Sequence, residues 1–169
     1  ELLPICNTAF MMRIPIIHIS GGDVTTGALD NNIRNAVTML STYHFPGTAE
    51  SAANIVRMRN SKQNIWAVGE LGLDAFNKEK LYTRAELAEN LHIKESSKWV
   101  LMTYHPETLG SLKYNIEVVG NCFQVLKQLS DCQIVVTFSN ADFGGDRINE
   151  LIKKVSEEMS DKFIAIPSL

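Results

Sequence analysis

The chain has 169 residues, of which 45% are hydrophobic and 21% are charged, and it contains 10 glycines and 5 prolines. This composition excludes a disordered or collagen-like chain and is typical of a folded protein with its own apolar core. Because 16 Lys and Arg stand against 19 Asp and Glu, for a formal net charge of −3, there is no overall basic field that would hold nucleic acid or an anionic membrane surface.

Strand-like and helix-like segments alternate along the first half of the chain. The β-branched run 14–19 predicts a strand that ends at Gly21-Gly22. Apolar residues at 33, 36, 37 and 40 follow with helical spacing, and Asp30 stands where a helix cap is expected. A short strand over 43–45, a helix from Thr48 to about Arg59 and a strand over 64–68 complete this half.

The second half repeats the alternation after a charged, helix-like connector over 74–97, and we place a domain boundary near Lys78. Strands are predicted over 98–103, 133–138 and 163–166, with helices over 112–126 and 148–159 between them. This order is typical of βαβ units around parallel sheets, so the predicted fold class is α/β. The pattern opens within a helix and stops just after a strand, so we expect an internal fragment of a longer protein.

Several kinds of site and location are not indicated. The thiols of Cys6, Cys122 and Cys132 are odd in number and widely spaced, which favours three reduced, buried thiols over disulfides or a zinc site. The histidines and acids show no metal-binding motif, so we expect no metal ion. Without an apolar run near the roughly 20 residues that span a bilayer, and without a signal peptide, the sequence predicts a cytoplasmic protein with no membrane or nucleic-acid partner.

The residues that follow each predicted strand are the candidate functional residues, because ligands of open α/β sheets bind beyond the carboxyl ends of the strands. Asp23 and Asp30 follow the first strand and could divide general-base and general-acid roles. The alternative is structural, with Asp23 in a turn and Asp30 as a helix cap. His18 lies within the strand, where a supporting role is favoured.

Two later loops carry further candidates. His105 follows the strand over 98–103 and could bind a phosphate or carry a proton. The loop 139–147 holds Asn140 and Asp142 and has two glycines before a helix, a position that favours anions or, alternatively, serves only as a capping turn. The glycines lack the GxGxxG spacing, so a dinucleotide site is not indicated.

Taken together, four segments carry a more specific signal: IPIIHISGGDVTTGALDNNIRNA, VGELGLDAF, TYHPET and TFSNADFGG. In this order they resemble the hydrolysing branch of the UDP-N-acetylglucosamine 2-epimerase family, essentially over the whole chain. The resemblance implies two Rossmann-like domains in the GT-B-like architecture of nucleotide-sugar glycosyltransferases, with the active site between them. Residues 1–77 would be the second half of the amino-terminal domain and 78–169 the first half of the carboxy-terminal domain, so the fragment alone is expected to be inactive.

The same resemblance implies the chemistry. The substrate would be UDP-N-acetylglucosamine, which the family converts with water into N-acetylmannosamine and UDP by elimination to a glycal and hydration, on a route to sialic-acid-type sugars. No cofactor is required, and we expect a homo-oligomer.

Position by position, the resemblance assigns proton transfer to Asp23 and Asp30 and a phosphate contact to His105. The expected substrate-binding residues are Arg34, Asn140 and Asp142. Two departures from the family pattern matter most: Asp23 stands for the usual Glu, and Asn31 stands for the second of two acids. Ser139 also stands where the family often has Pro.

Three alternatives remain open at this point. The substrate could be a related nucleotide sugar such as a diacetamido-trideoxyhexose. The two departures could have left a module that binds nucleotide sugars without catalysis. A glycosyltransferase of the same fold is the third reading, and it would require an acceptor.

Overall fold

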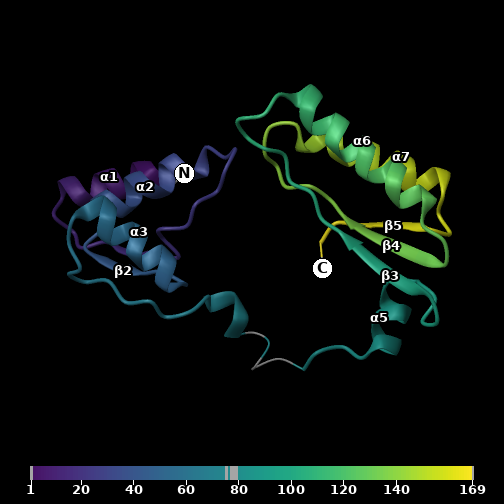
Figure 1. Cartoon of the computed structure of the whole chain (residues 1–169), viewed down its shortest axis with the longest axis horizontal. Coiled ribbons are helices and arrows are strands. Elements are labelled where there is room, and N and C mark those ends of the chain that lie inside the picture. Colours follow the sequence, from purple (N-terminus) through teal and green to yellow (C-terminus); the bar gives the residue numbers. More distant parts are fainter. Residues whose placement is uncertain (1, 75, 77–79, 169) are drawn as a thin grey trace. The chain divides into compact units, whose positions relative to one another are not determined.

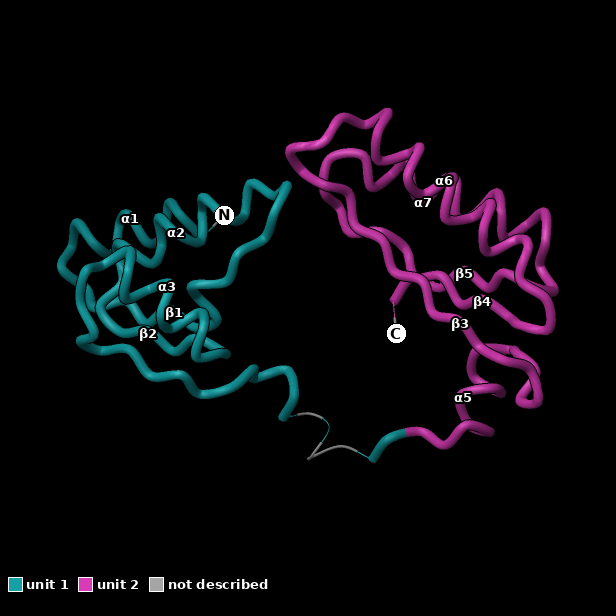
Figure 2. The backbone as a smooth tube through the Cα atoms, viewed as in Figure 1, with its two compact units in different colours: residues 1–81 teal, residues 82–169 magenta. Residues whose placement is uncertain are grey.

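The computed structural model describes residues 2–74, 76 and 80–168. The chain forms two compact units, residues 1–81 and residues 82–169 (Figure 2). The predicted boundary near Lys78 lies outside the described residues. Figure 1 labels most of the helices and strands of both units.

Unit 1 consists of short parallel strands and the helices that connect them. In chain order its elements are α1 (Leu2–Met11), β1 (Ile17–Ile19), α2 (Asp30–Leu40), β2 (Tyr43–Phe45), α3 (Ala49–Arg59) and the 3-10 turn η1 (Leu71–Leu73). Strands β1 and β2 are parallel, with His18 opposite His44. The predicted cap of α3 is confirmed, because the side chain of Thr48 accepts a hydrogen bond from the Ser51 N–H.

The small core of unit 1 lies on one face of this sheet. Val37 of α2 and Ile55 of α3 are buried in it together with Cys6 of α1. Residues on the opposite face of the strands are open to solvent, with 59% of Ile17 and 49% of Ile19 exposed. Side chains alternate between faces along a strand, so unit 1 has one covered face and one apolar face that is open to solvent at Ile17 and Ile19 and covered in part by Trp66.

The predicted strand over 64–68 does not form as a regular strand. This segment makes one parallel bridge, between Ile65 and His44, supported by the hydrogen bond from Trp66 N to His44 O at 3.0 Å. Trp66 is correspondingly not a core residue: it is 48% exposed and stacks on Phe45 with ring centroids 5.4 Å apart. A β2 of only three residues offers too short an edge for longer pairing, which is the reason for the difference.

Unit 2 is a three-stranded parallel sheet with helices on both faces. Its elements are α5 (Arg84–Asn90), β3 (Lys98–Met102), α6 (Leu112–Gln128), β4 (Cys132–Thr137), α7 (Gly145–Glu158) and β5 (Phe163–Ile166). The sheet has the order β3-β4-β5. The three predicted strands and the two long helices of this half are confirmed, and the connector forms only the short helix α5, behind a capping box at Thr83 and Glu86.

Helices α6 and α7 cover one face of this sheet, as Figure 1 shows, while α5 packs on the other. Val119 and Phe123 of α6 and Ile148 and Ile152 of α7 are buried against Ile134 of β4. Each fully buried side chain of this kind stabilises the fold by roughly 1.5–3 kcal/mol. The central strand β4 is buried on both faces, which places the loop that follows it at a fixed point of the sheet edge.

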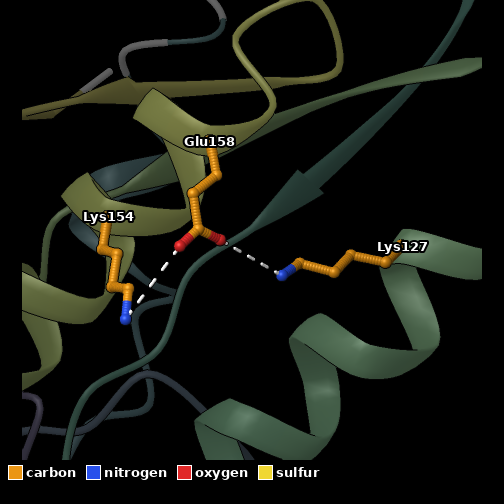
Figure 3. A network of polar contacts seen from close by, with 3 residues as sticks. All are labelled: Lys127, Lys154 and Glu158. Carbon is orange, nitrogen blue, oxygen red and sulfur yellow. Dashed lines mark ion pairs between the residues drawn. The ribbon is translucent and has the colours of Figure 1, made fainter.

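The outer surface of this helix pair carries a small ion-pair network (Figure 3). Glu158 of α7 lies 3.7 Å from Lys127 of α6 and 4.0 Å from Lys154 one helical turn away. The three side chains are solvent-exposed, so each pair contributes at most about 1 kcal/mol. The apolar core therefore holds the two helices together.

The observed fold class is α/β with parallel sheets, as predicted. All three cysteines are free, but only Cys6 is buried, because Cys122 lies on the exposed side of α6 and Cys132 is partly exposed at the start of β4. Within residues 2–74, 76 and 80–168, none of the helices combines the length and the apolar character that crossing a bilayer would need.

Candidate functional site

Helix α3 anchors the loop Gly21-Gly22-Asp23 that follows β1. The backbone at Gly22 has φ +86°, and a Cβ there would lie 2.2 Å from the Ser51 carbonyl oxygen, so only glycine fits this close approach. The Ser51 hydroxyl donates a hydrogen bond to Asp23 Oδ1, and Asn54 Nδ2 donates to the Gly22 carbonyl at 2.7 Å. The Asp23 carboxylate is therefore held on a half-buried loop by two residues of α3.

Helix α2 holds the same loop from its other side. Arg34 Nη1 donates to the carbonyl oxygen of Asp23 at 3.0 Å and to Thr25 Oγ1 at 3.1 Å. Asn31 Oδ1 accepts from the backbone N–H of Thr25 at 3.3 Å. The guanidinium of Arg34 thus positions the loop that carries Asp23, and its predicted contact with substrate stays a prediction.

Asp30 does not cap α2, which corrects the alternative structural reading of this residue. The residue at the cap position is Leu29, in a helical conformation and without a side-chain cap hydrogen bond. The N–H groups of Asn31 and Asn32 donate hydrogen bonds to the carbonyls of Ala28 and Leu29. These backbone carbonyls take the place of a capping side chain at the start of the helix. Asp30 is the exposed first residue of the helix, where the helix dipole favours its carboxylate.

Two histidines lie side by side beneath the loop, one on each strand. His18 Nδ1 lies 3.2 Å from Thr38 Oγ1, and a Cβ at Gly21 would lie 2.7 Å from the His18 ring. The His18 and His44 rings meet edge to face with centroids 6.3 Å apart. Burial, with a smaller contribution from the nearby Arg34 charge, lowers the pKa of His18. This favours a neutral ring that supports the loop.

His44 is fully buried and was not among the residues predicted from the sequence. Burial first, and then the charges of Arg59 and His18, lower its pKa to about 4, against a weaker raising effect from the backbone of Ser41. Neither ring nitrogen has a hydrogen-bond partner among the described residues. The only signal in the sequence was a histidine at the centre of a three-residue strand.

A third carboxylate, also missed from the sequence, stands at the same sheet edge. Ser20, directly after β1, donates its hydroxyl to Glu70 Oε2 at 3.2 Å. A Cβ at Gly47, two residues after β2, would lie 1.5 Å from Glu70 Oε1, so the missing side chain leaves room for this carboxylate. The feature of the sequence that could have identified Glu70 was its position, just after the strand-like run 64–68.

In unit 2 the structure brings together three predicted residues, His105, Asn140 and Asp142. His105 Nδ1 accepts a hydrogen bond from the backbone N–H of Asn140 at 3.1 Å. A neutral His105 therefore carries its proton on Nε2, which faces away from this bond as a donor. Asn140 Nδ2 in turn donates to Asp142 Oδ2 at 2.6 Å.

Tight backbone packing connects this loop to the start of α7. A Cβ at Gly145 would lie 2.1 Å from the carbonyl oxygen of Asn140, and Gly144 has φ +90°. The Asn149 side chain pairs with the backbone of Ser139 through two hydrogen bonds of 2.7 and 3.2 Å. The loop is thereby fixed at the helix N-terminus, a position that favours anionic groups.

The segment around His105 is held by a buried amide of α6. Asn115 Oδ1 accepts from the Tyr104 hydroxyl at 2.7 Å and from the Glu107 N–H at 2.9 Å, and its Nδ2 donates to the Glu107 carbonyl at 3.2 Å. Asn115 was not among the residues predicted from the sequence. A polar residue in the apolar stripe of a helix was the signal that could have identified it.

The candidate residues thus fall into two groups, one in each unit. Asp23, Asp30 and Arg34 belong to unit 1, and His105, Asn140 and Asp142 belong to unit 2. Among the residues with described positions, no three or more His, Cys, Asp and Glu side chains form a group that could hold a metal ion. The groups supply carboxylates, an imidazole and a helix N-terminus, which suit proton transfer and anion binding.

Comparison with known proteins identifies the family. A model described as UDP-N-acetylglucosamine 2-epimerase matches residues 1–169. The chain is 26% identical over 162 residues to the GDP/UDP-N,N'-diacetylbacillosamine 2-epimerase (hydrolyzing) of Campylobacter jejuni, covering 96% of this chain and 42% of that protein. It is 30% identical over 156 residues to the UDP-N,N'-diacetylbacillosamine 2-epimerase (hydrolyzing) of Legionella pneumophila, covering 91% and 40%.

Solved structures show the same fold. The crystal structure of the Neisseria meningitidis UDP-GlcNAc 2-epimerase bound to UDP-GlcNAc matches with a TM-score of 0.72 and 18% identity, over 97% of this chain and 45% of that one. The Methanocaldococcus jannaschii enzyme in complex with UDP-GlcNAc and UDP matches with a TM-score of 0.70 and 16% identity, over 98% and 46%. The chain spans less than half the length of each of these relatives. With all 169 residues matched by the family model, the chain belongs to the UDP-N-acetylglucosamine 2-epimerase family.

Proposed function

We propose that this chain is part of a hydrolysing nucleotide-sugar 2-epimerase that converts UDP-N-acetylglucosamine and water into N-acetylmannosamine and UDP. The observation that carries the proposal is the family match over all 169 residues, within which Asp23 is held by α3 at the end of β1. The two Rossmann-like domains of a GT-B-like architecture are part of the same proposal.

The reaction needs a base for the proton on carbon 2 and a donor for the departing diphosphate. In the proposed mechanism a carboxylate takes this proton while the bond between carbon 1 and the UDP oxygen breaks, which gives a glycal and UDP. Water then adds to carbon 1, and carbon 2 receives a proton on its opposite face. Asp23 and Asp30 are the proposed proton carriers, one acting as the base at carbon 2 and the other as the acid.

The groups of unit 2 suit the leaving group. His105 presents Nε2–H because its Nδ1 is engaged by the backbone of Asn140. A donor aimed at a phosphate oxygen stabilises the charge that develops as UDP departs. Asn140 and Asp142 are the proposed substrate-positioning residues of the neighbouring loop, and Arg34 completes the proposed set from unit 1.

A second candidate substrate is a UDP-linked N,N'-diacetyl sugar. The specific observation in its favour is that the relatives from Campylobacter jejuni and Legionella pneumophila are both named diacetylbacillosamine 2-epimerases. The chemistry at carbons 1 and 2 would be the same. The two candidates differ only in the groups carried elsewhere on the sugar ring.

The test is a turnover measurement with the full-length protein, given each of the two UDP sugars in deuterated water without added metal and followed by proton NMR. The expected result is release of UDP and of a free sugar inverted and deuterated at carbon 2. The Asp23→Asn variant should lower the rate by at least about a hundredfold. Asp131→Asn is the matched control, because it makes the same change on the exposed turn before β4.

The remaining outcomes decide between the alternatives. Turnover of only one sugar identifies the substrate. UDP binding without turnover of either sugar would reject the epimerase and favour a non-catalytic nucleotide-sugar-binding module. Transfer of the sugar to an acceptor, with no free inverted sugar, would instead identify a glycosyltransferase.

A further inference from the structure

Unit 1 contains a pocket of about 200 Å³ between the Asp23 loop and the helices α2 and α3. This volume is more than ten times the roughly 10–15 Å³ that a single water needs, so the pocket can hold a group of several heavy atoms. Its lining is polar and apolar in similar measure. The lining residues are Gly22, Asp23, Val24, Asn31, Asn35, Asn54, Arg57 and Met58.

The hydrogen bonds of the lining show which groups remain for a ligand. Asn54 is engaged on both sides, by the Gly22 carbonyl and by Arg57 Nη2. Asn31 uses only its Oδ1, which accepts from Thr25. Among the described residues, the Nδ2 of Asn31 and the whole amide of Asn35 have no hydrogen-bond partner, although both side chains are partly buried.

The charges of the lining favour a neutral ligand. One carboxylate, Asp23, and one guanidinium, Arg57, cancel each other, so neither an anion nor a cation meets a net opposite charge. The unpartnered amides offer both donors and acceptors, and Val24 and Met58 add apolar surface. A small neutral group with one donor, one acceptor and one methyl matches this combination.

We propose that the pocket receives the acetamido group of the sugar, an inference that rests on the proposed function above. The Asn31 amide donates to the acetamido carbonyl, the Asn35 carbonyl accepts its N–H, and the apolar side chains contact its methyl group. The acetamido nitrogen is bonded to carbon 2, the atom that loses its proton. Binding this group beside Asp23 therefore brings the carbon 2 proton toward the carboxylate that removes it.

The pocket also connects the two departures from the family pattern. Asp23 is one methylene shorter than the usual Glu, and Asn31 replaces an acid with a neutral amide. Both residues line this one pocket. Together the two substitutions leave it larger and less negative than the family pattern would, which fits an amide ligand better than a cationic one.

The test measures binding to the full-length protein rather than turnover. Calorimetric titrations with UDP-N-acetylglucosamine, UDP-glucose and UDP are compared in an Asp30→Asn background, in which turnover is expected to be slow. UDP-glucose has a hydroxyl where the acetamido group stands. We expect Asn35→Ala to weaken binding of UDP-N-acetylglucosamine roughly tenfold, the loss of about one hydrogen bond, and to change UDP and UDP-glucose less than twofold.

Asn32→Ala is the matched control, because Asn32 is an exposed amide on the same helix and outside the pocket lining. It should leave all three affinities unchanged. An equal loss for all three ligands in Asn35→Ala, or no loss for any, would overturn the acetamido pocket while the proposed epimerase stands. Selective weakening in a protein that never turns over would support the pocket and reject the epimerase. A parent protein that binds none of the three ligands would overturn both.

Discussion

A single backbone N–H decides which nitrogen of His105 can act as a donor. Because Asn140 N engages Nδ1 at 3.1 Å, the neutral ring presents Nε2–H. His105→Asn keeps an acceptor near the Nδ1 position and removes this donor. We expect it to lower kcat of the full-length protein about a hundredfold or more, with little change in melting temperature, as measured by UDP release and thermal unfolding.

His92→Asn is the control for this prediction. His92 is exposed in the turn after α5, with φ +54°, a conformation that Asn tolerates well. It should leave kcat unchanged. A His105→Asn protein that retains more than half of the parental kcat would remove His105 from the reaction.

The buried His44 makes a separate prediction about stability and pH. Its pKa is about 4 in the folded chain and near 6.5 when unfolded, so between these values the unfolded state binds more protons. The lowered pKa therefore leaves the free energy of unfolding at its full value above pH 6.5, and this free energy decreases as the pH falls toward 4. We expect a loss on the order of 3 kcal/mol, measured by urea unfolding at several pH values.

His44→Leu tests this cause directly, since neither ring nitrogen makes a hydrogen bond among the described residues and the effect of the Ser41 backbone on the ring is weak. An apolar side chain of similar size should keep unit 1 folded and flatten the dependence on pH between 4 and 6.5. An unchanged slope in the leucine variant would assign the dependence to other groups.

At the scale of elements, one arginine attaches α5 to the sheet of unit 2. The Arg84 guanidinium stacks on the Trp99 ring at 3.7 Å and donates through Nε to the Glu95 carbonyl at 2.9 Å and through Nη2 to the Ser97 carbonyl. We expect Arg84→Ala to lower the free energy of unfolding by about 1–2 kcal/mol, and Arg84→Lys to recover little of it, because lysine lacks the planar fork. Chemical denaturation measures both.

Arg147→Ala is the comparison for Arg84. Arg147 pairs with Glu150 on an exposed helix surface, so its loss should cost much less than the loss of Arg84. Equal effects of the two alanine variants would mean that the stacking and the backbone contacts of Arg84 contribute nothing beyond a surface charge.

Elements that bury a continuous apolar run were the ones that could be predicted from the sequence. The β-branched run of β4 is buried on both faces, and its bounds lie within one residue of the predicted strand. The segment 64–68 has a similar composition but only a three-residue neighbour, so tertiary context decided against a regular strand. Asp30 had the residue type of a cap, yet the backbone of Ala28 and Leu29 took that role.

The candidate site was predictable where it follows strands and not where it depends on partners distant in sequence. Position after a strand identified Asp23 and His105. Ser51 binds Asp23 from 28 residues away, and Asn115 organises the segment around His105 from the facing helix. No local pattern connects such pairs, because only the packing of the helices on the sheets brings them together.

At the scale of the whole molecule, the partly exposed apolar face of the β1 and β2 strands predicts self-association. Ile17, Ile19 and Tyr43 expose apolar surface there. Contiguous apolar patches on soluble proteins mark contact surfaces. We expect the 169-residue chain to associate with increasing concentration in sedimentation velocity, and Ile19→Lys to reduce it. Met39→Lys, a similar change at an exposed position of α2, is the control and should leave the association unchanged.

The last prediction concerns activity and chain length. The 169-residue chain covers 40–42% of the length of two curated relatives, so most of their residues have no counterpart in it. A transition state that needs a base and leaving-group donors tolerates little displacement, since about 1 Å can cost a hundredfold in rate. We expect no UDP release by this chain above the blank, and turnover by the full-length protein, in the same NMR assay.

The full-length Asp23→Asn variant shows whether an inactive 169-residue chain reflects its missing length or an assay that does not report the proposed chemistry. If that variant also releases no UDP while the full-length parent does, the assay reports the proposed chemistry. The missing length then accounts for the inactivity of the 169-residue chain. Turnover by the 169-residue chain within tenfold of the parent would contradict the prediction. It would mean that Asp23, Asp30 and His105 form a sufficient site with the residues present here, and that the additional length of the relatives serves regulation or assembly.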